Sequence, residues 1–170
     1  YDGPRVRVKV IPGFGFYMSA NYAAEPPEWR YLVEAKAGVC LSKKRNIWFD
    51  AGILNSHFTN ESPVSKDQLM YSRSLGPEYV PYYLSGVKLT LPVSKKITMY
   101  LYGINGWQKI RIEQYGGAGS LQLECKLTKK MLVNWNAYVG NERTTTDDNK
   151  RIRYFSDFYF VYSSKKFTAS

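Results

Sequence analysis

Residues 120–140, SLQLECKLTKKMLVNWNAYVG, alternate between apolar and polar side chains on both sides of a short basic turn. In the first half the apolar residues take the odd positions, beginning at Leu121, and the polar residues take the even ones. The alternation resumes at Met131, after Lys129 and Lys130. A period of two is typical of a β-strand with one apolar face, so this stretch predicts an antiparallel hairpin.

Two environments accept a hairpin with one apolar face. In a soluble sandwich the apolar side chains pack beneath a second sheet and the polar ones face water. In a membrane barrel the apolar side chains face lipid and the polar ones line the lumen. The organisation of the remaining chain has to decide between these two environments.

The composition points to an all-β protein with an anionic neighbour. Aromatic residues make up 16% of the 170 residues, which is above ordinary usage, and no sustained helical periodicity is present. The formal net charge of +10 fits nucleic acid, an anionic membrane surface or an anionic solute as the partner. No apolar run approaches the roughly 20 residues of a membrane-spanning helix. This excludes a membrane protein that spans with helices, but it does not exclude one that spans as a β-barrel.

Alternating runs recur along the chain and predict about eight antiparallel strands in an up-and-down order. The first is a long strand over residues 5–22, kinked at Pro12 and Gly13, where a turn is the alternative. The other predicted strands cover residues 31–42, 47–54, 82–93, 97–104, 120–128, 131–140 and 151–163. We expect a single β-barrel domain over residues 1–170, with a long external loop at 55–81 where the periodicity disappears.

The connections between these strands alternate in length. Short Lys-rich turns follow Leu41, Val93 and Leu127, and longer loops follow Leu54, Trp107 and Gly140. Outer-membrane barrels have short turns at one rim, longer loops at the other, and strands of about ten residues. Aromatic residues near the strand ends suit an interfacial girdle, although Tyr and Trp favour strands in any case. The pattern favours a transmembrane barrel over a soluble sandwich.

Several segments, spread in order over most of the chain, resemble a known family. They are ANYAAEP at residues 20–26, VCLSKKRNIWFDAGILNSHFTNESPVSKD at 39–67, SRSL at 72–75, PYYLSGVKLT at 81–90, NGWQKI at 105–110 and RYFSDFY at 153–159. On these segments the chain resembles the OmpL-like β-barrel porins of the Bacteroidetes outer membrane. The resemblance implies an outer-membrane barrel of porin type, and we expect the chain to be part of a larger barrel.

The polar parity of the predicted strands identifies the candidates for a lumen wall. They are Arg5, Arg7, Lys9, Glu34, Lys36, Asp50, Lys88, Glu124, Lys126, Arg151, Arg153 and Asp157. Cations outnumber carboxylates in this set, and such a wall concentrates anions. The alternative is a set of cross-strand ion pairs that fills the interior. In the long loop, Lys66, Asp67 and Arg73 are candidates for a constriction, unless the loop is a solvated surface or a partner site.

These features predict a porin-like outer-membrane protein, a passive channel for small solutes that favours anions. The alternatives are a non-conducting structural barrel within an outer-membrane protein complex, and a soluble basic β-domain that binds nucleic acid by stacking. The expected partners are outer-membrane lipid and either other envelope proteins or further copies of the chain, with no nucleic acid. The single histidine, His57, has no second histidine or nearby cysteine, so we expect no catalytic residue, no metal site and no cofactor.

Overall fold

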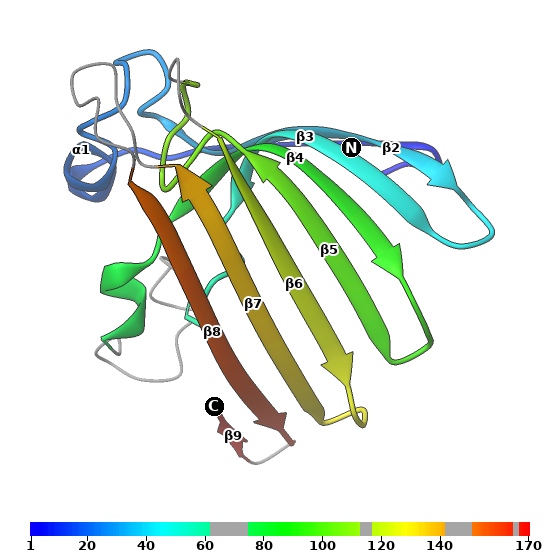
Figure 1. The fold of residues 1–170 in the computed structure, drawn as a ribbon. Helices are drawn as coiled ribbons and strands as arrows, with labels where there is room; N and C mark the ends of the chain where they lie inside the picture. Colours follow the sequence, from blue (N-terminus) through cyan, green and yellow to red (C-terminus); the bar gives the residue numbers. More distant parts are fainter. Residues whose placement is uncertain (62–74, 113–116, 142–150, 165–166) are drawn as a thin grey trace.

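The computed structural model describes residues 1–61, 75–112, 117–141, 151–164 and 167–170. Within these residues nine antiparallel strands form one sheet, and their spatial order is the order of the sequence. Figure 1 shows the sheet as a curved, open surface, with β1 at one edge and β8 with the short β9 at the other. The predicted all-β, up-and-down architecture is confirmed. In the described part of the chain the two edges do not pair with each other.

The strands follow the alternating runs of the sequence closely. Their bounds are β1 Val6–Pro12, β2 Leu32–Ser42, β3 Ile47–Asn55, β4 Tyr83–Pro92, β5 Ile97–Ile104, β6 Ala118–Lys126, β7 Met131–Asn141, β8 Ile152–Ser163 and β9 Thr168–Ala169. A short 3-10 helix, η2, covers Gly76–Tyr79. The sequence did not predict β9, because two residues are too few to display a period of two.

The prediction of one long strand over residues 5–22 is wrong. β1 ends at Pro12, and Phe16–Asn21 form the short helix α1. A proline cannot donate a hydrogen bond to the ladder, and Gly15 has a φ of 102°, a conformation that glycine adopts without strain. The apolar residues beyond the break, such as the buried Met18, therefore pack as helix and loop side chains.

The connections are sorted between the two ends of the sheet (Figure 1). Residues 43–46, 93–96 and 127–130 form short turns at one end, which we call the turn rim. Because successive strands are antiparallel, the connections after β1, β3, β5 and β7 leave from the opposite end, which we call the loop rim. None of the helices in the described ranges has the length and apolar character needed to cross a bilayer.

The sheet has an apolar face and a polar face. The exposed large hydrophobic side chains of the apolar face include Val8, Val39, Phe49, Val87, Leu101, Trp135, Val139 and Phe158. The buried polar side chains of the polar face are Glu34, Asp50, Ser120, Gln122, Asn134 and Asn136. A water-soluble sheet buries its apolar side chains and exposes its polar ones, so this distribution is inverted. Among the described residues no second sheet covers the apolar face.

Two hydrophobic clusters lie near the loop rim, one on each face. The cluster on the polar face contains Leu54, Phe58, Val80, Leu84, Tyr102, Ile104 and Tyr138. The cluster on the apolar face contains Met18, Tyr22, Ile53, Tyr83 and Ile110. In the second cluster the ring of Tyr22 stacks on Tyr83, with 4.3 Å between centroids, and the Tyr83 hydroxyl donates to the buried Glu25 at 2.8 Å. This packing holds the residues after α1 against β4.

Candidate functional site

The polar face carries a row of residues in register across the whole sheet. From β1 to β8 the Cα partners in this row are Arg7, Gly38, Asp50, Lys88, Tyr102, Ser120, Tyr138 and Phe155. Side chains alternate between the two faces of a strand, so cross-strand partners share a face. The next rows on the same face add Lys9 opposite Lys36, and Gln122 opposite Asn136. These rows make the polar face the candidate functional site.

Arg7 and Asp50 pair across the intervening strand β2. The Arg7 Nε donates to Asp50 Oδ1 at 2.6 Å, and Nη2 donates to Oδ2 at 2.5 Å. Gly38 lies between them, and a Cβ at this position would collide with Asp50 Oδ1. The Arg7 guanidinium also lies over the Trp48 ring, 4.3 Å from its centroid. Glycine at position 38 therefore provides the space in which the arginine reaches across β2.

Two buried carboxylates on this face are each shared between two cations. Lys9 and Lys36 lie 2.8 and 2.6 Å from Glu34. Lys88 lies 3.7 Å from Asp50, which also accepts the arginine described above. The side chains of Glu34 and Asp50 are 1% and 0% exposed, whereas those of the four cations retain 16 to 52% exposure. Four cations around two carboxylates leave a positive surplus, and the exposed charge is the positive one.

A hollow of about 350 Å³ opens beside these four cations. Its lining residues are Tyr1, Asp2, Arg7, Val8, Lys9, Lys36 and Lys88. We call this feature the cationic hollow. Its volume lies within the range of small-molecule sites, and cationic walls raise the local concentration of anions.

The polar face over β5 to β8 is richer in neutral polar side chains, and these form a chain of hydrogen bonds that ends at Asp157. The Tyr102 hydroxyl donates to Gln122 at 3.0 Å, and Gln122 donates to Asn134 at 2.9 Å. Asn134 then donates to Asn136 at 2.9 Å, and Asn136 donates to Asp157 at 3.1 Å. Both asparagines are fully buried. Buried amides joined in this way fix the side chains in one arrangement.

The residues directly after β3 cover this neutral part of the polar face. We call residues 56–61 the covering segment. The Asn136 amide donates to the His57 carbonyl at 2.9 Å, and the Thr59 N–H donates to Asp157 Oδ2 at 2.9 Å. These bonds join the covering segment to β7 and β8, which are far from it in the sequence.

Aromatic packing also holds the covering segment against the sheet. The Phe58 ring centroid lies 5.6 Å from that of Trp107 and 5.3 Å from that of Phe155. Trp107 lies edge-on to Tyr138, with 4.8 Å between centroids. Phe58 is 3% exposed, so the covering segment contributes a core residue to the polar face.

His57 is neutral in this environment. Its Nε2 lies 2.7 Å from Ser120 Oγ, which in turn donates to the Ala137 carbonyl at 2.7 Å. A hydroxyl has one proton to donate, so Ser120 accepts from His57, and we assign the ring proton to Nε2. The His57 ring stacks on Tyr102 at 4.0 Å. Burial, and secondly the positive charge of Lys88, lower the pKa of His57 to about 3.

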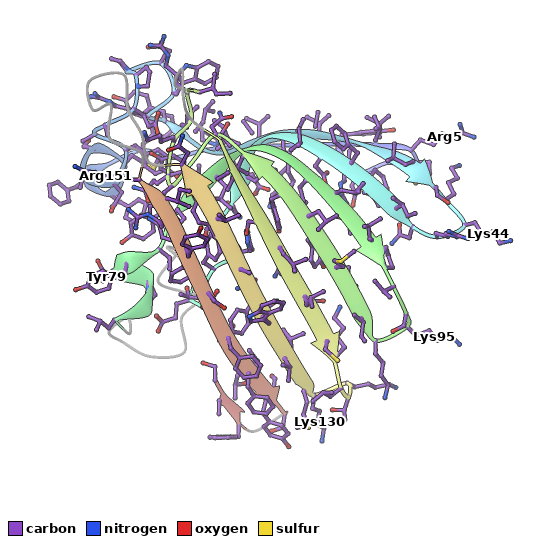
Figure 2. All side chains as sticks on the ribbon, viewed as in Figure 1. Arg5, Lys44, Tyr79, Lys95, Lys130 and Arg151 are labelled. Carbon is purple, nitrogen blue, oxygen red and sulfur yellow. The ribbon has the colours of Figure 1, made fainter. Side chains whose placement is uncertain are left out.

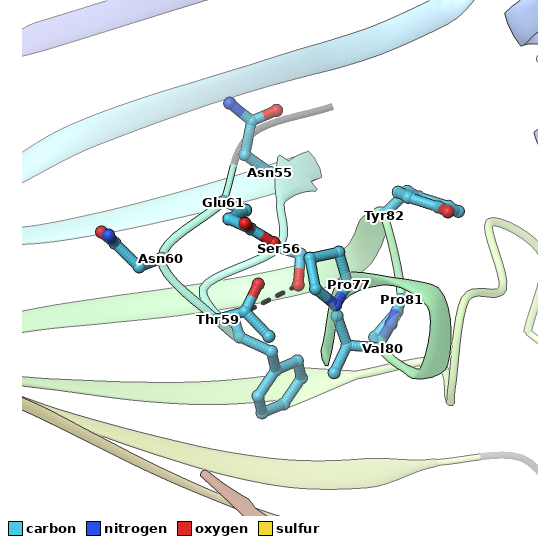
Figure 3. Close-up of a pocket in the computed structure, with 10 residues that line it drawn as sticks. Asn55, Ser56, Thr59, Asn60, Glu61, Pro77, Val80, Pro81 and Tyr82 are labelled. Carbon is cyan, nitrogen blue, oxygen red and sulfur yellow. Dashed lines mark hydrogen bonds between the residues drawn. The ribbon is translucent and has the colours of Figure 1, made fainter. Parts of the chain in front are cut away.

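A second hollow, of about 230 Å³, lies between the covering segment and residues 77–82 (Figure 3). Asn60 and Glu61 line it from one side, and Pro77 and Val80 line it from the other. Its described lining contains one carboxylate and no Lys or Arg, in contrast to the cationic hollow. The described residues include no group of three or more His, Cys, Asp and Glu side chains suited to hold a metal ion.

The comparison with protein families decides what kind of molecule this is. The family described as "Putative beta-barrel porin-2, OmpL-like" matches the chain over residues 1–170. The chain belongs to this family. The OmpL-like porin family predicted from the sequence segments is thereby confirmed, whereas the Bacteroidetes origin stays a prediction. Neither curated proteins nor solved structures gave a match.

Membership of the OmpL-like β-barrel porin family agrees with the architecture described above. Porins of the outer membrane are antiparallel, up-and-down β-barrels whose apolar side chains face outward. The open antiparallel sheet and its exposed apolar face fit this description. The family implies an outer-membrane location, and its porin-like character suggests a function other than catalysis.

The structure brings half of the predicted lumen residues together. Arg7, Lys9, Glu34, Lys36, Asp50 and Lys88 form one cluster. Nearer the turn rim Lys126 pairs with Glu124 at 3.3 Å. Asp157 contacts the covering segment, Arg153 lies over the Trp107 ring at 4.7 Å, and Arg5 and Arg151 are exposed just before β1 and β8. Lys66, Asp67 and Arg73 lie outside the described residues.

Sequence reasoning missed the neutral half of the polar face. The residues concerned are His57, Tyr102, Gln122, Asn134 and Asn136. The signal was present for four of them, because they occupy the polar positions of their strands. Only residues that are charged at neutral pH were selected as lumen candidates, and this choice omitted the amides and the tyrosine.

Proposed function

We propose that this OmpL-like porin forms a passive channel for small solutes, with a preference for anions, and that its polar face lines the lumen. The observation that carries the proposal is the inverted sheet. Asp50 and Asn136 are buried on one face, while Phe49, Leu101 and Val139 are exposed on the other. Lipid accepts exposed hydrophobic side chains, and a water-filled lumen accepts polar ones. In this proposal the apolar face contacts outer-membrane lipid.

The cationic hollow supports the preference for anions. Asp50 and Glu34 are buried beneath their cations, so a solute on the polar face would meet Lys9, Lys36 and Lys88 first. Charged side chains along a pore wall attract counter-ions and exclude ions of their own sign. The sequence left two interpretations of these residues open, a cationic lumen wall and a set of cross-strand ion pairs. The two are compatible, because the ion pairs fill the wall and their cations still face the lumen.

The covering segment supports a constriction inside the channel. It occupies the polar face over β5 to β8, whereas the cationic hollow beside β1, β2 and β4 remains open. Solutes would therefore pass along the cationic side. Lys66, Asp67 and Arg73 belong to the same connection and remain candidates for its narrowest part.

The proposal places these strands in a larger barrel. A closed barrel of about eight strands is filled by its own side chains and leaves little room for solutes. A wider barrel leaves a lumen beside the covering segment. Further strands would pair with the sheet at its two edges.

Planar bilayer recording with the full-length protein tests the proposal. Discrete conductance steps are expected, with a reversal potential in a salt gradient that favours anions. Folding of the inserted protein is verified by its heat-modifiable migration on gels. Repeated insertion of folded protein without conductance steps would refute the channel.

A second candidate function is a non-conducting structural barrel within an outer-membrane protein complex. The observation that favours it is the filling of the polar face by Phe58, Trp107 and Tyr138 and by a row of buried amides on the same face. This function predicts folded protein without channels, together with stable co-purification of other envelope proteins.

A further inference from the structure

The three described turns of the turn rim share one sequence pattern. Each turn, taken with the end of the strand before it, contains an apolar residue, a hydroxyl residue and two lysines in this order: LSKK at residues 41–44, VSKK at 93–96 and LTKK at 127–130. No Asp or Glu occurs in these three stretches. The recurrence at all three of these turns distinguishes the pattern from scattered surface lysines.

The same kind of hydrogen bond shapes each of these turns. Ser42 Oγ accepts from the Arg45 N–H at 3.3 Å, Ser94 Oγ accepts from the Ile97 N–H at 3.0 Å, and Thr128 Oγ1 accepts from the Lys130 N–H at 3.1 Å. A hydroxyl that bonds a backbone N–H two or three residues ahead stabilises a tight turn. The lysines are thus left at the tip, and their side chains are not used to build the turn.

The six lysines of these turns form a basic edge of the sheet. Lys43, Lys44, Lys95, Lys96, Lys129 and Lys130 are all exposed. Figure 2 shows Lys44, Lys95 and Lys130 at the tips of successive turns. None of the six pairs with a carboxylate in the part of the chain that the structure describes. Their charge is therefore available to an external partner.

Each lysine pair stands next to an exposed apolar side chain. Leu41, Val93 and Leu127, which directly precede the hydroxyl residues, are 59%, 63% and 42% exposed. The order from the sheet outward is therefore apolar residue, hydroxyl, cations. This order matches the sequence of layers from acyl chains to phosphate groups across a membrane interface.

The loop rim differs in charge. Its described connections carry both signs of charge: the carboxylates Glu25, Glu28, Glu61 and Glu78, and the cations Arg30, Lys109, Arg111 and Arg151. An asymmetry of this kind distinguishes the two sides of the membrane. The three turns of the turn rim, by contrast, carry six lysines and no carboxylate.

We propose that the turn rim is a docking surface for the anionic phospholipid headgroups of the leaflet that it faces. The inference rests on the proposed function in one respect, namely that the apolar face spans the bilayer. A nucleic acid or an acidic protein would also bind the cations, but neither accounts for an exposed Leu or Val beside every pair. Each Ser/Thr-Lys-Lys turn offers two ammonium groups to headgroup phosphates.

The preference for anionic lipid is measured directly by electron paramagnetic resonance. Full-length protein is reconstituted in phosphatidylcholine vesicles with a trace of spin-labelled phosphatidylglycerol or spin-labelled phosphatidylcholine. One variant carries K43Q, K44Q, K95Q, K96Q, K129Q and K130Q, and a matched control carries Arg at the same six positions. The double variant K95Q/K96Q provides a milder change in case the sixfold variant fails to fold.

Wild-type protein is expected to bind labelled phosphatidylglycerol about fivefold more strongly than labelled phosphatidylcholine at low salt. This factor is the effect of one cation near an anionic headgroup. High salt and the six Gln substitutions should bring the ratio towards one, the Arg variant should keep it, and K95Q/K96Q should lower it in part. An unchanged ratio in the Gln variants, or no preference in the wild type, overturns the inference.

Conductance of the same vesicles separates this inference from the proposed function. Lipid preference without conductance would leave the inference standing and refute the channel. Conductance without lipid preference would support the channel and overturn the inference. Lysine-dependent retention of an acidic envelope protein, with no lipid preference, would also overturn the inference.

Discussion

Arg7 on β1 reaches across Gly38 of β2 and holds Asp50 on β3 through two hydrogen bonds. This contact joins the edge strand to the third strand of the sheet, in addition to the backbone ladders between neighbours. The fully buried carboxylate of Asp50 depends on this contact, because Lys88, the second cation beside Asp50, lies farther away, at 3.7 Å. The contact exists only because residue 38 has no side chain.

Gly38→Ala should destabilise the protein by about 2 kcal/mol. The new Cβ collides with Asp50 Oδ1, so the Arg7–Asp50 pair must separate. Breaking a fully buried pair costs about 3–5 kcal/mol, and the partial exposure of Arg7 reduces this figure. Gly103→Ala is the matched control, because its Cβ would meet Val87 at an ordinary 3.4 Å. Urea unfolding of both variants in vesicles measures the difference, and equal losses would contradict the assigned contact.

Replacing Lys36 and Lys88 by Gln should reduce the anion preference of the channel. Each substitution removes one cation from the cationic hollow while Glu34 and Asp50 keep another partner. One charge at contact distance in water contributes about 1 kcal/mol, or about fivefold in local anion concentration. The reversal potential in a salt gradient measures the change, with the Lys→Arg double variant as control. The same reversal potential in the Gln and Arg variants would exclude the hollow from the permeation route.

Phe58→Ala should loosen the covering segment. The ring packs against Trp107 and Phe155, and removal of a buried phenylalanine costs about 3–5 kcal/mol. Larger single-channel conductance is expected as well, since the segment would no longer be held over the sheet. Phe16→Ala, at an exposed position of α1, is the control and should change neither quantity appreciably. Lower stability with unchanged conductance would show that the segment does not narrow the lumen.

Acidification should destabilise the folded protein through His57. Folded His57 stays neutral down to a pKa of about 3, whereas in the unfolded chain the same residue takes up a proton near the ordinary histidine pKa of 6.5. Between these values the unfolded state binds more protons, so the free energy of unfolding falls as the pH falls and is highest above 6.5. His57→Gln keeps a donor towards Ser120 without titrating, and should remove this slope. The measurement is the free energy of unfolding of the wild type and of the His57→Gln variant across this pH range. Parallel slopes in the two proteins would contradict a neutral His57 in the folded state.

The strands were predictable because each alternating run is long enough to display its period. The hairpin of β6 and β7 is the clearest case, since residues 118–126 and 131–141 pair without a register shift. The helix α1 was missed because Phe16, Met18 and Ala20 kept the same parity as β1. Only the proline and glycines before them marked the change.

The candidate site was predicted in part for a related reason. Parity placed Arg7, Asp50 and Lys88 on one face without any knowledge of their contacts. The burial of His57 and Phe58 was not predictable, because a loop has no periodicity and its contacts with β5 to β8 are distant in sequence. Such contacts depend on the curvature of the whole sheet.

The central claim is that the apolar face meets lipid and the polar face meets water. Site-directed spin labelling along β6 tests it most directly, after the free thiols Cys40 and Cys125 are replaced by Ser. Labels at Leu121 and Leu123 should be accessible to oxygen dissolved in the bilayer, and labels at Glu124 and Lys126 to a water-soluble nickel complex. Labels at Leu121 and Leu123 that neither reagent reaches would contradict the account, because they would place these residues beneath another layer of protein.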